Sequence, residues 1–163
     1  MKEQRIVHPF PPVYDENSEI LILGSFPSVV SRQLNFYYAN KYNRFWPVLS
    51  ALFDERITDR KQFCLNHHIA LWDVIHSCRI TGSSDTSIHD VTVNDISDLV
   101  KKTKISCIFT TGKKASSLYD RYIHLNIEHI SLPSTSSANA AMRKEDLIRS
   151  YSVILEKLHE KES

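Results

Sequence analysis

Cysteine is scarce in this chain, and its few cysteines form no recognisable pair. The 163 residues include only Cys64, Cys78 and Cys107, which lie far apart and in or beside apolar runs. An odd number of isolated cysteines in such surroundings is typical of small core residues in a reducing compartment. An iron–sulfur cluster normally needs four thiolates, so this chain alone cannot supply one.

Membrane segments and several catalytic motifs are also missing. No apolar run approaches the length of a bilayer span, and residues 1–10 lack the apolar core of a secretory signal, which favours the cytoplasm. The sequence contains no G-x-G-x-x-G, Walker A or G-x-S-x-G motif, which argues against a dinucleotide fold, nucleotide triphosphate hydrolysis and an esterase. Its eight histidines show no metal-ligand spacing such as H-E-x-x-H, so we expect no metal site.

A strong excess of one charge is absent as well. The net charge is +1, whereas proteins that bind DNA tightly and nonspecifically usually carry a clear basic excess. The basic residues nevertheless gather in three places, at residues 32–44, 113–114 and 143–144. Net charge therefore neither requires nor excludes a nucleic-acid partner.

What the sequence does contain is an alternation of strand and helix patterns. With 42% hydrophobic and 24% charged residues, its composition is globular, and we expect a single domain over residues 1–163. Near-continuous apolar, β-branched runs are typical of strands buried on both faces, and four are present, at residues 20–23, 69–74, 105–110 and 127–132. Helical spacing of apolar residues occurs at residues 45–53, 93–100, 113–122 and 143–158. This order predicts an α/β fold, a three-layer α/β/α sandwich around a four-stranded, mainly parallel sheet.

The segments that follow the predicted strands matter, because ligands of such sheets lie at the carboxyl ends of the strands. Residues 81–87 and 133–139 are rich in small hydroxyl side chains, and Gly112 is followed by two lysines at a helix start. Hydroxyls, backbone amides and helix N-termini bind phosphate oxygens. The pattern predicts a ligand that carries phosphate, although residues 133–139 taken alone also fit a solvated turn before a helix.

Residues 35–46 combine aromatic rings, amides and cations more densely than any other segment. Aromatic rings mixed with Lys and Arg can stack on an unpaired base and hold its backbone. In the alternative interpretation, Phe45 and Trp46 form the core face of the next helix and Asn43 is its N-cap. For Asn43 the two interpretations are compatible, since a capping Asn can still face a cleft.

Three segments, taken together and in order, resemble the uracil-DNA glycosylase superfamily, and the branch they look most similar to is the hypoxanthine-DNA (DNA-deoxyinosine) glycosylases. They are residues 23–28 (LGSFPS), 37–46 (YYANKYNRFW) and 132–139 (LPSTSSAN), with residues 71–74 and 112–114 also similar. The resemblance covers about residues 7 to 156. It implies an enzyme that acts on damaged DNA without metal or cofactor. The sequence does not reveal the oligomeric state, for which a monomer is the default expectation. Such an enzyme flips a deaminated base into a cleft at the strand ends and hydrolyses its N-glycosidic bond.

The resemblance also implies roles for individual residues. Asn43 matches the catalytic amide of the hypoxanthine branch, Tyr38 the ring that stacks on the flipped base, and Asp73 a position that reads the base edge. We expect these residues to bind the base: Gly24, Ser25, Phe26, Pro27, Tyr38 and Asp73. We expect these to contact DNA: Arg44, Lys113, Lys114, Ser134, Thr135, Ser136, Ser137 and Asn139.

Two positions depart from the expected patterns, and they keep other interpretations open. Mismatch-specific uracil/thymine glycosylases carry an Asn where this chain has Phe26, and a ring without polar atoms cannot orient water. Ser137 stands where a Pro is expected, which would loosen its loop. A structural ion pair or helix cap is the alternative role for Asp73. For the whole chain, the alternatives are a mismatch uracil glycosylase and a catalytically silent DNA- or nucleotide-binding module of the same fold.

Overall fold

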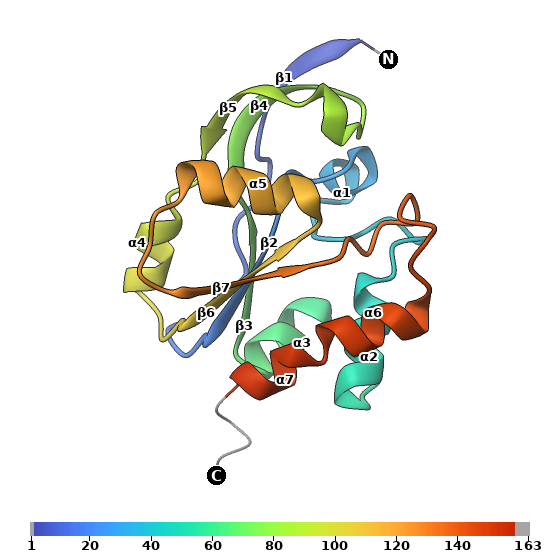
Figure 1. Cartoon of the computed structure of the whole chain (residues 1–163), viewed down its shortest axis with the longest axis vertical. Coiled ribbons are helices and arrows are strands. Elements are labelled where there is room, and N and C mark those ends of the chain that lie inside the picture. Colours follow the sequence, from blue (N-terminus) through green and yellow to red (C-terminus); the bar gives the residue numbers. More distant parts are fainter. Residues whose placement is uncertain (1, 159–163) are drawn as a thin grey trace.

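The computed structural model describes residues 2–158, which fold around a parallel four-stranded sheet (Figure 1). Its strand order is β3 (Ile69–Asp73), β2 (Ile20–Gly24), β6 (Cys107–Thr111) and β7 (Glu128–Leu132). All neighbouring pairs are parallel. The four apolar runs of the sequence correspond to these four strands, so this part of the prediction is confirmed.

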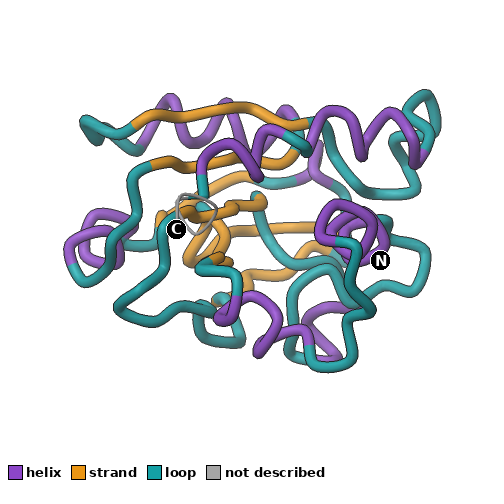
Figure 2. The backbone as a smooth tube through the Cα atoms, turned by 90° about the horizontal axis from the view of Figure 1, so that it is seen from below, coloured by secondary structure: helices purple, strands orange, loops and turns teal. Residues whose placement is uncertain are grey.

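Helices cover both faces of this sheet (Figure 2). Ile20 and Ile22 point to one face and share a core with α2 (Phe45–Phe53), α3 (Arg60–Asn66), α6 (Lys144–Tyr151) and α7 (Val153–Lys157). Leu21 and Leu23 point to the other face and pack with α4 (Ile96–Lys101) and α5 (Lys113–Tyr122). Burial on both faces is the reason why β2 reads as a continuous apolar run. The predicted three-layer α/β/α sandwich is therefore confirmed.

A second, antiparallel sheet was not predicted. It consists of β1 (Glu3–Val7), β4 (Ile75–Thr81) and β5 (His89–Val93) in the order β1-β4-β5. No strand was expected directly after residues 69–74, but β4 begins only two residues after β3 ends. A single break at Val74 lies inside one apolar run, so hydrophobic periodicity could not reveal the change of sheet.

Several helix boundaries also differ from the prediction. The helix expected at residues 93–100 begins at Ile96, because Val93 belongs to β5. The C-terminal helix is interrupted at Ser152 and forms α6 and α7. Short helices α1 (Val29–Leu34), α3 and the 3-10 turn η1 (Asp85–Ser87) were missed. Asp59, whose side chain accepts from the backbone N–H of Gln62, was a capping signal that could have revealed α3.

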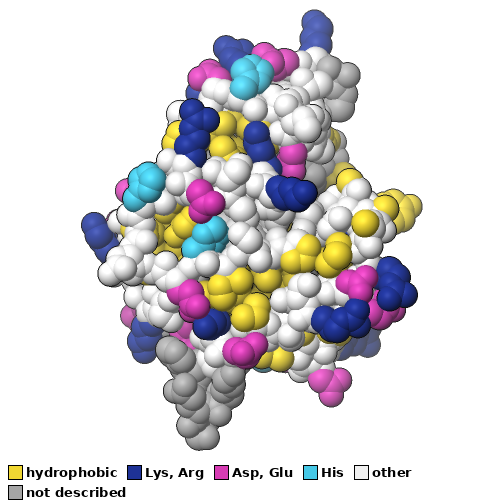
Figure 3. Space-filling model, in the orientation of Figure 1, with side chains coloured by type: hydrophobic (Ala, Val, Ile, Leu, Met, Phe, Trp, Pro, Cys, Tyr) yellow, Lys and Arg dark blue, Asp and Glu magenta, His cyan; other side chains and the backbone are white. Residues whose placement is uncertain are grey.

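The surface carries charges of both signs in close mixture. On the face shown in Figure 3, Lys and Arg side chains alternate with Asp and Glu instead of forming one basic field. No helix within residues 2–158 is long and apolar enough to cross a membrane. All three cysteines are free and buried, as expected, and burial raises the pKa of the Cys107 thiol to about 11, so the neutral, unreactive form prevails.

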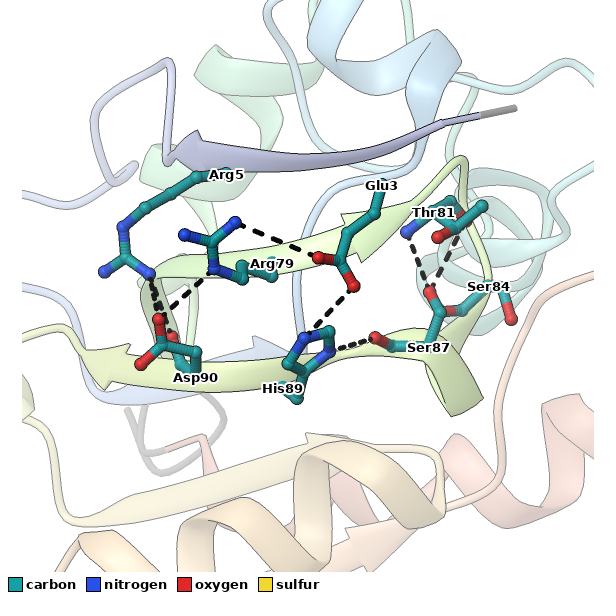
Figure 4. Close-up of polar contacts among 8 residues, drawn as sticks. All are labelled: Glu3, Arg5, Arg79, Thr81, Ser84, Ser87, His89 and Asp90. Atoms are coloured by element: carbon teal, nitrogen blue, oxygen red, sulfur yellow. Dashed lines mark hydrogen bonds and ion pairs between the residues drawn. The ribbon is translucent and has the colours of Figure 1, made fainter.

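Charged side chains on the exposed face of the antiparallel sheet link β1 to β4 and β5 (Figure 4). Asp90 Oδ2 lies 2.8 Å from Arg5 Nη1 and 3.5 Å from Arg79 Nε. Glu3 lies 3.8 Å from Arg79 Nη1 and 3.1 Å from His89 Nε2. Each exposed pair contributes little on its own, but together they supplement the backbone pairing that fixes β1 on β4.

Candidate active site

A cavity of about 230 Å³ opens at the carboxyl ends of the parallel strands. Gly24, Asp73 and Thr111, the last residues of β2, β3 and β6, line it together with the loop that follows β7. A cavity of roughly 150 Å³ already holds a benzene ring, so this one can accept a larger planar ring. Its position follows the general rule for ligands of parallel sheets.

The cavity brings together most of the predicted site residues. Those that line it are Gly24, Ser25, Phe26, Pro27, Tyr38, Asn43, Asp73, Ser134, Thr135, Ser136 and Ser137. The lining residues that sequence reasoning missed are Ser28, Ser31, Tyr37, Asn40, Ser83, Asp85 and Thr111. Thr111 could have been found, because it ends its strand as Asp73 does. Most of the others lie in segments that the sequence had pointed to, without being assigned to the site themselves: Ser28, Tyr37, Asn40, Ser83 and Asp85. Ser31 lies in α1, which was not predicted.

Four predicted residues do not line the cavity: Arg44, Lys113, Lys114 and Asn139. Lys113 is exposed at the start of α5, directly after Gly112, on which a Cβ would lie 3.4 Å from Ser134 Cβ. Lys114 is half-buried, and its charge acts on Asp85 in the cavity wall. The lysines therefore lie at the rim of the site and not inside it.

Asn43 is held by two hydrogen bonds that both use its carbonyl oxygen. Oδ1 accepts from the backbone N–H of Phe45 (2.9 Å) and from Thr135 Oγ1 (2.8 Å). A backbone N–H can only donate, which fixes the oxygen in this place and leaves the Nδ2 amide as the group available to the cavity. The expected N-cap role needs a correction of one position, since α2 begins at Phe45 and its N-cap residue is Arg44.

Tyr38 supplies an aromatic wall. Its backbone adopts the left-handed conformation with φ 52°, which is uncommon for a bulky residue. Its ring stacks on Phe45 with centroids 3.8 Å apart and planes 13° apart, and its hydroxyl lies 3.2 Å from Thr111 Oγ1. Burial, together with the nearby Asp73, raises the pKa of Tyr38, so its hydroxyl stays neutral. Phe45 and Trp46 are core residues, as the alternative interpretation had it, and Phe45 backs the stacking ring.

Two carboxyl groups lie in the cavity wall. Asp73 is almost fully buried, and its Oδ2 lies 2.7 Å from His8 Nε2, so Asp73 has a structural partner and also lines the cavity. Asp85 accepts from Ser25 Oγ at 3.3 Å. Burial raises the pKa of Asp85, while the Ser25 hydrogen bond and the charge of Lys114 oppose this shift.

The serine-rich loop after β7 is tied to Arg44. The guanidinium donates to the carbonyl oxygens of Ser136 (2.7 Å), Asn139 (3.0 Å), Thr135 (3.4 Å) and Met142. Asn139 in turn donates from Nδ2 to Ser134 O at 3.0 Å. The loop is thus anchored on both sides of Ser137 despite the missing Pro, and Arg44 uses its donors within the protein.

Loss of the Arg44 guanidinium should release this loop. For Arg44→Met we expect amide hydrogen exchange at residues 134–142 to accelerate roughly tenfold to hundredfold, because hydrogen bonds to a charged donor contribute about 1.5–3 kcal/mol. Arg143→Met, which removes an exposed arginine at the end of the same loop, is the matched control and should leave exchange unchanged. Equal exchange in both variants would show that the guanidinium does not order the loop.

Chemically, the cavity suits a flat polar ring that has both donors and acceptors at its edge. Tyr38 offers a ring face, Asp73 a carboxyl oxygen and Asn43 an amide donor. Serine and threonine hydroxyls surround the opening. Within residues 2–158, no three His, Cys, Asp or Glu side chains are grouped so as to hold a metal ion.

Comparison with known proteins gives consistent matches over most of the chain. The family model of the Uracil DNA glycosylase superfamily matches residues 11–158. A Hypoxanthine DNA glycosylase of Methanosarcina acetivorans is 38% identical over 143 residues, which cover 83% of this chain and 89% of the relative. One from Methanosarcina barkeri is 35% identical over 138 residues, which cover 80% and 86%. The solution NMR structure of a candidate uracil DNA glycosylase from Methanosarcina acetivorans superposes with a TM-score of 0.76 at 32% identity, and the match covers 92% of this chain and 99% of that one.

Proposed function

The chain belongs to the Uracil DNA glycosylase superfamily, and from this premise we propose that it hydrolyses the N-glycosidic bond of hypoxanthine in DNA. The observation that carries the proposal is the cavity at the strand ends, which joins the Asn43 amide, the Tyr38 ring and the Asp73 carboxyl group. Curated relatives named for hypoxanthine support the choice of base. The partner is damaged DNA, and the expected compartment is the cytoplasm.

The base enters the cavity after it has been flipped out of the duplex, at a cost of a few kcal/mol that is lowest for a damaged pair. Its ring stacks on the face of Tyr38 that Phe45 leaves open. Asp73 accepts a hydrogen bond from N1–H, a donor that hypoxanthine has and adenine lacks. Asp73 therefore distinguishes hypoxanthine from adenine. It does not distinguish hypoxanthine from uracil or xanthine, which also carry an N–H that can donate to Asp73.

The bond between C1′ and the base nitrogen breaks with positive charge on the sugar and negative charge on the departing base. Asn43 Nδ2 donates to this developing negative charge, because its oxygen is already occupied by Phe45 and Thr135. Water then adds to C1′, and overall a proton passes from water to the base. A preorganised donor of this kind acts without a strong base, since its orientation is fixed before the reaction.

The residues at the rim hold the DNA. Lys113 and Lys114 contact phosphate at the start of α5, and Ser134 to Ser137 enter the minor groove beside the vacated position. Ser25, Phe26 and Pro27 line the base cavity and contact the base. Arg44 and Asn139 serve the complex by holding the serine loop in shape, as their hydrogen bonds to its carbonyls indicate.

Base release from duplex oligonucleotides tests the proposal. Matched duplexes contain hypoxanthine, uracil, xanthine or no lesion, and each reaction includes EDTA. We expect an abasic product from hypoxanthine, and none from undamaged DNA. Preference for uracil would favour the mismatch uracil glycosylase instead. A folded protein that binds DNA but yields no abasic product from any lesion would be the silent binding module.

A further inference from the structure

His8 contacts Asp73 in the wall of the candidate site, although it precedes residues 11–158, the part of the chain that the family model matches. It directly follows β1, and its backbone N–H donates to His76 O at 2.7 Å, which continues the pairing of β1 with β4. Its side chain is only 3% exposed. Strand β1 therefore places a buried imidazole against Asp73, which lines the cavity.

Both ring nitrogens of His8 are engaged, and their partners define where the protons are. Nδ1 lies 2.8 Å from the carbonyl oxygen of Phe10, which can only accept, so Nδ1 carries a proton. Nε2 lies 2.7 Å from Asp73 Oδ2, and this contact also needs one proton, on either the imidazole or the carboxyl group. In both arrangements the pair has no net charge, which lowers the cost of burying it.

The pair is immobile. The His8 ring packs edge-on against Phe10 at 4.8 Å and against Phe26 at 6.0 Å between centroids, so it has little room to turn. The backbone carbonyl of Asp73 accepts from Asn94 Nδ2 at 2.8 Å. Side chain and backbone of Asp73 are therefore both held.

One oxygen of Asp73 remains for the cavity. Oδ1 lies 2.6 Å from the position that a Cβ on Gly24 would occupy, at the end of the neighbouring strand and in the cavity wall. We propose that His8 is a positioning residue that holds the Asp73 carboxyl group so that Oδ1 accepts the N1–H of the lesion base. The proposal rests on the proposed function and adds a determinant of base specificity outside the region of the family match.

Two amide variants of His8 distinguish a role in positioning Asp73 from a role in packing. His8→Asn keeps an N–H near Phe10 O but does not reach Asp73, whereas His8→Gln can place its amide N–H where Nε2 lies. His129→Asn is the control, because the His129 side chain is also largely shielded from solvent and hydrogen-bonded, to Thr110 Oγ1 at 2.8 Å on the far side of the sheet.

The measurement compares single-turnover release of hypoxanthine with release of unsubstituted purine, which lacks N1–H. The ratio of the two rates is taken relative to wild type, so intrinsic differences between the leaving bases cancel. We expect His8→Asn to lower the ratio roughly tenfold to hundredfold, the effect of losing one hydrogen bond to a charged or ionisable partner. His8→Gln should restore most of it, and His129→Asn should not change it.

The outcomes distinguish the inference from the proposed function. If wild type releases hypoxanthine and His8→Asn lowers both rates equally, His8 is a structural residue and the inference is wrong. A folded His8→Asn variant that releases both bases at the wild-type rates overturns the inference as well. If wild type releases no base from any lesion, the proposed function itself is wrong, and the role of His8 in reading the base is wrong with it.

Discussion

Asn43→Ala should lower the single-turnover rate of hypoxanthine release by roughly 10²–10³-fold while the affinity for DNA is retained. The expected size is that of removing one preorganised donor from a developing negative charge. The variant also removes the acceptor of Phe45 N–H and Thr135 Oγ1, which should cost about 1–2 kcal/mol of stability. The rate is measured with the protein in excess over labelled duplex, and affinity by fluorescence anisotropy on a duplex containing an abasic site.

Asn43→Asp removes the amide donor and keeps the two contacts that the Asn43 oxygen accepts. A carboxylate keeps both acceptor contacts and suits the N-terminus of α2, so the melting temperature should stay close to that of wild type. Its two oxygens cannot donate, so the rate should fall as far as in Asn43→Ala. Release at the wild-type rate by a saturating amount of Asn43→Asp would show that the amide nitrogen is not the catalytic group.

Gly24→Ala should reduce base release by roughly 100-fold or more, because the added methyl group meets Asp73. The Cβ would lie 2.6 Å from Asp73 Oδ1, far below an ordinary contact, and 3.5 Å from the Tyr38 hydroxyl. Asp73 cannot easily withdraw, since its other oxygen is bonded to His8. Overpacking of this kind typically costs about 1–3 kcal/mol, so the variant should still fold, and circular dichroism and melting curves check this.

The control for Gly24→Ala is Leu21→Ala on the same strand. Leu21 is fully buried on the opposite face of the sheet, and its truncation should cost about 2–5 kcal/mol without entering the cavity. At a temperature where both variants are folded, Leu21→Ala should release hypoxanthine nearly as fast as wild type. If Gly24→Ala does so too, the position of Asp73 Oδ1 is not critical for the reaction.

The four parallel strands could be predicted because burial on both faces leaves a direct trace in the sequence. Residues such as Ile20 to Leu23 must all be apolar when helices cover both sides. Strand β1 leaves no such trace, since most of its residues are exposed. Strand β4 was hidden because Ile75 continues the apolar run of β3, and only the three-dimensional path of the chain separates the two sheets.

The residues of the candidate site also fall into those that the sequence indicated and those that only the tertiary structure revealed. Gly24, Asp73 and residues 134–137 were assigned to one site by the resemblance to the glycosylases, and they do meet at the edge where the parallel strands end. The direction in which the Asn43 amide faces could not be predicted from the sequence, since it depends on which of its neighbours donates a hydrogen bond. Asp85 lies in a hydroxyl-rich segment whose path into the cavity wall has no pattern in the sequence.

The sequence by itself determined the class of fold, the positions of the four parallel strands and the residue types available at the strand ends, because burial and strand periodicity are local properties that each segment carries. Only the tertiary structure decided that Arg44 holds the serine loop and that His8 holds Asp73. The physical reason is that these hydrogen bonds join residues 65 and 92 positions apart. Their formation depends on distances that exist only once the whole sheet has assembled.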